Sequence, residues 1–392
     1  MILDFKIFLS ESIAADDKLK HLEHAEDHPI NAGAIGFKHA ADTLTAVHNQ
    51  LRRKDGSNVK VTMKYDGSPS IVFGYHPETK KFFVASKSAF NVKPKINYTD
   101  QDIEANHGHA PGLVSKLKSA LKHLPKVTPK GAVYQGDIMH TPEDVKTSGD
   151  ILNFKPNTIT YSVPKDSSVG KKVARAQLGV AVHTKYQGKT LTDMKAGFEP
   201  DTSSFKQHPD VHMISVEHPV ERTGYSSAQE REFESHMKKA KAVASSMTSA
   251  SHKAVERHRD NIKMYINDTV RQSTKPTTDG LRKYITARQA KALSTLKTDK
   301  ARSIKQQELK DSLDHLDANG HHIDKAFELH GHLQRAKDVL VHALSSNPGS
   351  FQHTIGGQAA KPEGFVAIKN GAPTKLVDRA EFSRANLLAA RG

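Results

Sequence analysis

The chain has 392 residues, of which 36% are hydrophobic, so it is long enough to bury more than one core. It contains no cysteine, which excludes disulfides, thiolate zinc sites and cysteine nucleophiles. Its 58 Lys and Arg outnumber its 43 Asp and Glu, and the formal charge at pH 7 is +15. Such a charge favours polyanionic partners, above all nucleic acids. No apolar run approaches the roughly 18 residues that a membrane-spanning helix needs.

Four segments can be distinguished along the chain, of which residues 1–57 are the first. Apolar residues in its second half recur at helical spacing and predict an amphipathic helix: Phe37, Ala41, Leu44, Val47 and Leu51. The first eleven residues end in Leu9-Ser10-Glu11. They are similar to the short leader that some large phages cut from packaged proteins after an aliphatic-x-Glu sequence. The alternative is a short strand or helix that packs on the core.

Residues 58–225 alternate short apolar runs with Gly, Pro, Asn and Asp, a pattern that is typical of strands joined by turns. The predicted strands are 59–64, 70–74, 82–86, 132–134, 159–163 and 178–183. One helix is predicted among them, over 111–124, because four leucines share one face: Leu113, Leu117, Leu121 and Leu124.

Residues 226–346 change to helical spacing and predict four or five helices that form a bundle. Residues 226–305 hold 18 Lys and Arg against 8 Asp and Glu, which is two thirds of the net charge of the chain. We interpret this block as a lid or clamp whose cations neutralise the phosphates of a nucleic acid. The alternative is an ordinary solvated helix surface. The predicted nucleic-acid contacts are Lys238, Lys239, Lys241, Arg257, Arg259, Lys263, Arg282 and Lys283.

Residues 347–392 return to the composition of strands and turns, notably at 364–369 and 375–377. The order of strands, helices and strands predicts an α+β fold of mixed and antiparallel sheets, with 226–346 as an inserted α-helical bundle. In that case 58–225 and 347–392 are two parts of one domain. The last strands then complete the site that the first strands begin.

The sharpest local motif is Lys64-Tyr65-Asp66-Gly67-Ser68, at the end of a predicted strand. A lysine in this place can project its amine into a cleft. We expect burial and neighbouring positive charge to lower the pKa of this amine, which would make it a nucleophile. Gly67 would allow a ligand to approach the backbone closely. The alternative is an exposed loop lysine, because so short a motif is common by chance.

Further motifs follow in order along the chain: Ser86-Lys87-Ser88, Val133-Tyr134-Gln135-Gly136-Asp137, Glu363-Gly364-Phe365-Val366-Ala367 and Lys375-Leu376-Val377. In order, spacing and residue type, across about 58–380, they resemble the covalent nucleotidyltransferase superfamily. This superfamily comprises ATP-dependent DNA ligases, RNA ligases and mRNA capping enzymes. Within it, the motifs look most like the phage tRNA-repair type of RNA ligase. The chain also resembles uncharacterised ligase-like proteins of large tailed phages.

The resemblance implies a ligase-type adenylation domain and a role for each motif. Lys64, in a motif that also holds the catalytic Asp66, would attack the α-phosphorus of ATP and form lysyl-AMP. Asp137 would hold the ribose hydroxyl or a metal, and Glu363 would help coordinate Mg²⁺ or Mn²⁺. Lys375 would contact the α-phosphate. Further nucleotide contacts are implied for Gly67, Lys87, Lys369 and either Tyr161 or Tyr186, one of which would stack on adenine.

Three positions depart from the pattern of the superfamily. Pro69 stands where Arg is frequent, Asp137 where Glu is usual, and Val377 where a second Lys closes the last motif. Lys369 or Arg379 could substitute for that second Lys. The sequence ends at Gly392, too soon for the C-terminal OB-fold that continues DNA ligases and capping enzymes. An RNA ligase is therefore favoured, and a degenerate enzyme that binds nucleotide without joining ends stays open.

The sequence therefore predicts an ATP-dependent polynucleotide ligase, for RNA rather than DNA, which joins 5′-phosphate to 3′-hydroxyl ends in the host cytoplasm. Its partners would be RNA or DNA ends and no membrane, and its cofactors ATP and Mg²⁺ or Mn²⁺. Two alternatives remain. One is a catalytically reduced nucleic-acid-binding protein with a ligase fold, packaged in the phage virion. The other is a nucleotidyltransferase that modifies an acceptor other than a nucleic acid.

Overall fold

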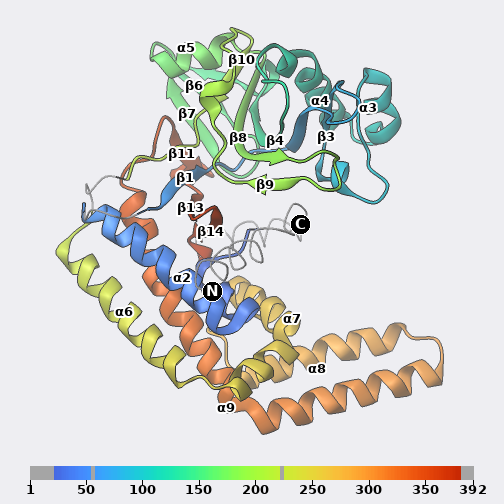
Figure 1. Cartoon of the computed structure of the whole chain (residues 1–392), viewed down its shortest axis with the longest axis vertical. Coiled ribbons are helices and arrows are strands. Elements are labelled where there is room, and N and C mark those ends of the chain that lie inside the picture. The colour runs from blue at the N-terminus through green and yellow to red at the C-terminus, as the bar shows by residue number, and fades with distance from the viewer. Residues whose placement is uncertain (1–21, 54–57, 221–224, 381–392) are drawn as a thin grey trace. The chain divides into compact units, whose positions relative to one another are not determined.

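The computed structural model describes residues 22–53, 58–220 and 225–380, and the proposed leader at residues 1–11 lies outside them. The described residues divide into two compact units (Figure 1). The sheet unit holds residues 58–220 and 345–373, and the helical unit holds residues 23–53, 225–344 and 374–380.

This division differs from the predicted segments at both ends of the chain. The predicted boundaries after residues 57, 225 and 346 lie within a few residues of the points where the chain passes between the units. However, the helix of the first segment and the residues after 373, which we had assigned to the closing strands, belong with the bundle. Buried ion pairs explain the difference, because Lys337 of the bundle bonds Glu26 and Arg379 bonds Asp27.

The largest sheet of the sheet unit has the strand order β10-β8-β4-β2-β3, with β9 paired to β8. Its strands are β2 (Ser70–Tyr75), β3 (Phe82–Ala85), β4 (Val133–His140), β8 (Leu178–Gln187), β9 (Lys195–Gly197) and β10 (Val211–Ile214). The pairing is antiparallel except between β8 and β10. Helices α3 (Asp100–His107) and α4 (Pro111–His123) pack against this sheet through Ile103 and Leu117, which share a core with Phe73 and Tyr134.

A second sheet has the order β12-β11-β7-β6-β5. It is formed by β5 (Lys146–Ser148), β6 (Ile151–Phe154), β7 (Thr160–Pro164), β11 (Gln352–Ile355) and β12 (Gln358–Ala359), and helix α5 (Ser168–Arg175) follows β7. A third sheet has the order β1-β13-β14, with β1 (Lys60–Lys64), β13 (Gly364–Lys369) and β14 (Ala372–Val377). Strands that follow the bundle in the chain thus pair with strands that precede it. The predicted α+β class is confirmed.

The helical unit consists of α2 (His28–Leu51), α6 (Ser227–Ser246), α7 (Ser249–Gln272), α8 (Thr278–Thr295) and α9 (Asp299–Leu344). Polar side chains begin three of these helices: Ser226, Thr248 and Thr277 each accept a hydrogen bond from a backbone N–H of the first turn. Apolar residues at helical spacing, among them Ile262 and Leu316, form one buried core. The prediction of four or five helices between 226 and 346 is confirmed. Within the described residues, no helix is both long and apolar enough to cross a membrane.

Candidate active site and basic cleft

Lys64 and Glu363 form the centre of the candidate site in the sheet unit. Strands β1 and β13 are antiparallel, and Lys64 is paired in register with Gly364. This register brings Glu363, the residue before β13, to the end of β1. The Lys64 Nζ donates hydrogen bonds of 2.7 Å to both carboxylate oxygens of Glu363. The side chain of Lys64 is 31% exposed and that of Glu363 is 7% exposed, so the lysine is the more accessible member of the pair.

The pKa of Lys64 is raised, which is opposite to our expectation. Burial acts to lower this pKa, but the Glu363 carboxylate outweighs it, with further contributions from Asp137 and Asp66. The expectation of neighbouring positive charge was wrong, because the charges that surround the amine are carboxylates. In the free protein Lys64 is therefore an ammonium, and it becomes a nucleophile only after losing a proton.

Asp66 is a buried anchor for the turn that follows Lys64. Its carboxylate accepts hydrogen bonds from Asn157 Nδ2 at 2.8 Å, from the N–H of Thr158 at 2.7 Å and from the N–H of Ile159 at 3.0 Å. These donors precede β7, so Asp66 ties the turn to the second sheet. Because both carboxylate oxygens are occupied in this way, we assign Asp66 a positioning role rather than the predicted catalytic one.

Gly67 permits a close approach of strand β4 to the turn. A Cβ at this position would lie 2.5 Å from Asp137 Cβ and 2.8 Å from Met139 Sδ, which is closer than atoms can pack. The Ser68 N–H donates to the Ile138 carbonyl at 3.0 Å, close to this contact. Gly67 therefore has a packing role that the sequence did not indicate: it lets the turn rest on β4 close to Asp137. The ligand contact of Gly67 stays a prediction.

Asp137 adds a second carboxylate next to Lys64, from the middle of β4. Burial acts to raise its pKa, but His183, a hydrogen bond with Ser70 and the Lys64 ammonium hold the pKa below its usual value. The His183 Nε2 lies 3.6 Å from Asp137 Oδ1. Sequence analysis placed His183 at the end of a strand but missed this role, because only the pairing of β8 with β4 brings it to Asp137.

The predicted metal ligands Asp137 and Glu363 both lie near Lys64. Among the residues described by the structure, no group of three or more His, Asp or Glu side chains is arranged to hold a metal ion. Mg²⁺ in phosphoryl-transfer sites is commonly held by one or two carboxylates together with phosphate oxygens and water. Two carboxylates beside a lysine amine are compatible with that kind of site.

The other predicted nucleotide contacts are distributed between the two units. Lys87 begins the short 3-10 helix η2 (Lys87–Phe90) after β3, and Lys369 ends β13. Lys375 belongs to the helical unit, where its N–H donates to the Glu23 carbonyl at 2.9 Å. Arg379 is buried and donates to Asp27 at 2.9 Å, so it cannot replace the missing second lysine of the last motif.

Neither Tyr161 nor Tyr186 offers a ring face to adenine, which corrects the predicted stacking role. Tyr161 is 1% exposed, and its ring packs against Phe154 and Phe351. Its hydroxyl accepts a hydrogen bond from the Asp66 N–H at 2.7 Å. Tyr186 is 2% exposed and donates to Gln135 Oε1 at 2.6 Å. Both rings point into the core because strand residues alternate between the two faces of a sheet.

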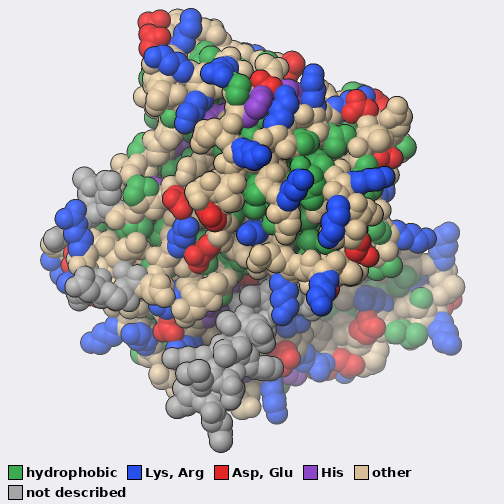
Figure 2. Space-filling view, turned by 45° about the horizontal axis from the view of Figure 1, so that its top comes forward, with side chains coloured by type: hydrophobic (Ala, Val, Ile, Leu, Met, Phe, Trp, Pro, Cys, Tyr) green, Lys and Arg blue, Asp and Glu red, His purple; other side chains and the backbone are tan. Residues whose placement is uncertain are grey.

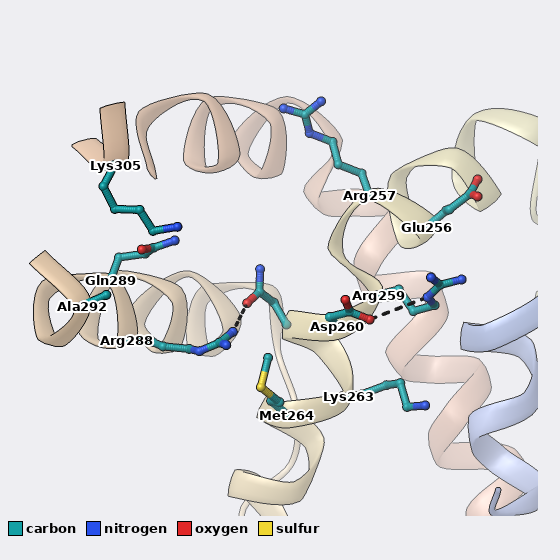
Figure 3. Close-up of a pocket in the computed structure, with 11 residues that line it drawn as sticks. Glu256, Arg257, Arg259, Asp260, Lys263, Met264, Arg288, Gln289, Ala292 and Lys305 are labelled. Carbon is teal, nitrogen blue, oxygen red and sulfur yellow. Dashed lines mark hydrogen bonds and ion pairs between the residues drawn. The ribbon is translucent and has the colours of Figure 1, made fainter. Parts of the chain in front are cut away.

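A cleft of about 750 Å³ lies in the helical unit between α7, α8 and the first half of α9 (Figure 3). Five cations line it, together with two carboxylates and four neutral residues: Arg257, Arg259, Lys263, Arg288, Lys305, Glu256, Asp260, Asn261, Met264, Gln289 and Ala292. The Arg288 guanidinium donates to Asn261 Oδ1 at 2.9 Å. We call this cavity the basic cleft.

The basic cleft gathers only part of the predicted nucleic-acid surface. It includes Arg257, Arg259 and Lys263 of the eight predicted contacts. Several of the eight make ion pairs instead of presenting a free charge: Lys263 with Glu23 at 2.7 Å, Arg282 with Asp317 at 2.9 Å, Lys283 with Asp279 at 2.7 Å and Arg259 with Asp260 at 3.8 Å.

The remaining predicted contacts are exposed without such partners. Lys238, Lys239 and Lys241 lie on the solvent side of α6, and Arg257 lies in the basic cleft. Within the part of the chain that the structure describes, none of these four makes an ion pair. Arg288 and Lys305 are cleft residues that the sequence analysis missed, because adjacent charges on separate helices become neighbours only in the folded bundle.

Searches of curated proteins and of solved structures gave no match to this chain. A family model, described as a family of unknown function (DUF6267), matches residues 17–391 and so spans both units. The chain, with its paired Lys64 and Glu363 and its basic cleft, belongs to this family.

Proposed function

We propose that the protein is an ATP-dependent covalent nucleotidyltransferase of the polynucleotide ligase type, with Lys64 as the residue that carries AMP. The observation that supports this most is the contact between Lys64 and Glu363. These residues lie 299 positions apart, in the first and the fourth of the motifs that suggested the function, and their side chains meet at 2.7 Å. Two independent motifs thus converge on a lysine whose side chain is partly exposed.

In the proposed first step, Lys64 Nζ attacks the α-phosphorus of ATP. An N–P bond forms, the bond between the α-phosphorus and the bridging oxygen breaks, and pyrophosphate leaves. The amine must first lose a proton, and the Glu363 carboxylate, which lies 2.7 Å away, would accept it. Asp137 and Glu363 would hold Mg²⁺ or Mn²⁺, and such an ion supplies charge compensation for the triphosphate when it is bound.

In the later steps AMP passes to a 5′-phosphate end, and a 3′-hydroxyl displaces it to form a phosphodiester. RNA is proposed as the substrate in preference to DNA, because the motifs look most like those of RNA ligases. The exposed lysines on α6 and the basic cleft are the surfaces that would meet the phosphate backbone.

Intact-mass measurement after incubation with ATP and Mg²⁺ tests the first step. The wild type should gain the mass of AMP, and Lys64→Ala should gain none. Lys60→Ala is the matched control, because Lys60 begins the same strand and pairs with Glu217 at 3.0 Å, yet it lies outside the site. Lys60→Ala should form the adduct as the wild type does. An adduct on Lys64→Ala, or none on the wild type with any nucleoside triphosphate, would contradict the proposal.

A nucleic-acid-binding protein without ligase activity is the second candidate, and the basic cleft is the observation that favours it. Under this reading, binding of a labelled single strand should weaken with salt and should not change in Lys64→Ala. Arg257→Glu with Arg288→Glu, which introduces two negative charges into the cleft, should weaken the binding. Wild-type protein that binds RNA but forms no adduct would select this candidate over the first.

A further inference from the structure

A second basic cavity, of about 380 Å³, lies in the sheet unit between helix α5 and the segment that leads into β10. Its lining has four cations, two histidines and no acidic residue: Lys171, Lys172, Arg175, Lys206, Gln207, His208, Pro209, Val211, His212 and Met213. We call it the α5 pocket. In contrast, the basic cleft of the helical unit contains two carboxylates among its cations.

The four cations of the α5 pocket are not neutralised by any carboxylate in the described part of the chain. None of the four makes an ion pair among the residues for which the structure gives a position. Asp210 is the carboxylate nearest in sequence, but its Oδ2 lies 2.6 Å from Lys126 Nζ and 3.3 Å from His123 Nδ1. Asp210 also lies 3.8 Å from Nδ1 of His208 in the pocket wall, but it does not line the pocket itself and pairs with none of the four cations.

Some other lysines of the same unit are paired with carboxylates. Lys60 pairs with Glu217 at 3.0 Å, Lys116 with Asp144 at 3.4 Å, and Lys118 with Glu104 at 2.6 Å. Cations near the last turn of α5 are in part favoured by the helix dipole. This explains Lys172 and Arg175 but not Lys206, which comes from a separate segment. Four like charges around one cavity repel each other, and a bound anion would relieve this repulsion.

The wall of the α5 pocket is held in place by close packing. The Ser167 side chain accepts a hydrogen bond from the Gly170 N–H at 2.9 Å and so caps α5. A Cβ at Gly170 would lie 2.0 Å from the Pro164 carbonyl oxygen, so α5 is in close contact with the end of β7. Val173 is buried beneath the helix. The cations therefore extend from a fixed backbone.

The inner side of the pocket is neutral and in part apolar. Burial, with His140 and Lys172, lowers the pKa of His212 to about 3, so that its ring is uncharged near neutral pH. Pro209, Val211 and Met213 add apolar surface. A cationic rim above a neutral, partly apolar floor suits a ligand that combines phosphate groups with less polar sugar or base surfaces.

We propose that the α5 pocket binds the phosphates of a single polynucleotide strand. The four cations would contact the backbone phosphates, and the neutral floor would face a sugar or a base. The inference does not depend on the chemistry of Lys64, because binding at the α5 pocket requires no covalent step. It requires only that the protein meets a nucleic acid.

Fluorescence anisotropy with a labelled twelve-nucleotide RNA, titrated at several salt concentrations, tests this site. The pocket variant carries Lys171→Ala, Arg175→Ala and Lys206→Ala. The matched control carries Lys130→Ala, Lys146→Ala and Lys155→Ala, which removes the same charge from exposed lysines of the sheet unit that do not line the pocket. Thermal unfolding should be similar for both variants, because all six side chains are exposed.

The pocket variant should bind the RNA roughly tenfold or more weakly than the wild type. The slope of log K against log salt should decrease by about 2, since three lost phosphate contacts at about 0.7 each are expected for a single strand. The control should change much less in both quantities. Equal losses in the two variants would overturn the proposal, and so would an unchanged affinity of the pocket variant. Both variants should still form the Lys64 adduct if the proposed ligase function holds, so the two ideas can fail separately.

Discussion

The sheet unit and the helical unit each contain a lysine that is paired with a glutamate, and the two pairs differ in their access to solvent. The Lys64 Nζ lies 2.7 Å from the Glu363 carboxylate, and the Lys337 Nζ lies 2.8 Å from Glu26. In both lysines burial acts to lower the pKa, and the glutamate reverses this effect so that the pKa is raised. However, Lys64 is 31% exposed, whereas Lys337 and Glu26 are both 0% exposed.

Because of this difference in exposure, we assign a reactive role to Lys64 with Glu363 and a structural role to Lys337 with Glu26. Lys337 cannot meet a ligand, and it joins α9 to the segment before α2. Arg379 lies 3.6 Å from the same Glu26 and brings the end of the described chain into this cluster. Lys64 makes one comparable pair at the end of a strand, with its side chain partly exposed. A raised pKa thus accompanies two different roles, and we infer that the exposure of the side chain decides which lysine can react.

The largest expected effect is on stability. The two lysines should differ in the unfolding free energy that is lost when each is replaced by alanine. Lys337→Ala removes the nearer of the two cations of buried Glu26 and leaves only Arg379, at 3.6 Å, so it should cost about 3 kcal/mol of unfolding free energy. Lys64→Ala removes a pair that is partly exposed on the lysine side and should cost roughly 1 kcal/mol or less. Urea unfolding of both variants beside the wild type gives the comparison. Equal destabilisation by the two substitutions would contradict the structural role of Lys337.

A control for this experiment replaces both residues of the buried pair, whereas Lys337→Ala removes only one of them. The double variant Glu26→Gln with Lys337→Met removes both charges and keeps similar side-chain volumes. It should recover a large part of the stability that Lys337→Ala loses, because no unpaired charge stays buried.

A smaller effect is expected from the turn that positions Lys64. Gly67→Ala would place a methyl group 2.5 Å from Asp137 Cβ, so β4 and the turn must separate. The cost should be about 1–3 kcal/mol of stability, together with a slower formation of the Lys64 adduct. Gly112→Ala is the matched control, because a Cβ there meets nothing within 4 Å, and it should leave both quantities nearly unchanged. Adduct formation at the wild-type rate in Gly67→Ala would show that this contact does not position Lys64.

The smallest expected change concerns the pair of Lys64 and Glu363, in the rate at which the Lys64 amine reacts at a given pH. Only the neutral amine reacts with an acylating reagent, so labelling of Lys64 should rise about tenfold per pH unit below its raised pKa. Glu363→Gln removes the charge that raises this pKa, so the pKa falls and labelling at pH 8 becomes faster. Site-resolved mass spectrometry measures this rate, with Lys60 as the internal reference. Slower labelling of Lys64 in Glu363→Gln would mean that Glu363 does not control its pKa.

Much of the fold could be predicted from local patterns. The apolar runs at 70–74 and 178–183 correspond to observed strands, which are buried on both faces. The helical period in 226–346 corresponds to observed helices, which bury one face each. Short elements such as β5 and α5 were missed, since they are too short and too polar to show a period. The motif order also indicated the meeting of Lys64 with Glu363.

Long-range packing accounts for what the sequence did not reveal. Glu26 and Asp27 look like solvated charges at a helix start, and only the folded bundle supplies Lys337 and Arg379 as their partners. Tyr161 has the residue type of a base-stacking aromatic, but its position in β7 turns it into the core. Burial of this kind depends on which sheets and helices meet, and local periodicity does not contain that information.

We propose that Lys64, and no other lysine, is the nucleophile. The most direct test is peptide mapping of wild-type protein after incubation with ATP and Mg²⁺, under conditions that preserve a phosphoramidate bond. We predict that AMP is found on the peptide that contains Lys64, and on neither Lys337 nor Lys87. AMP on a different lysine, or a protein that carries none, would contradict the account.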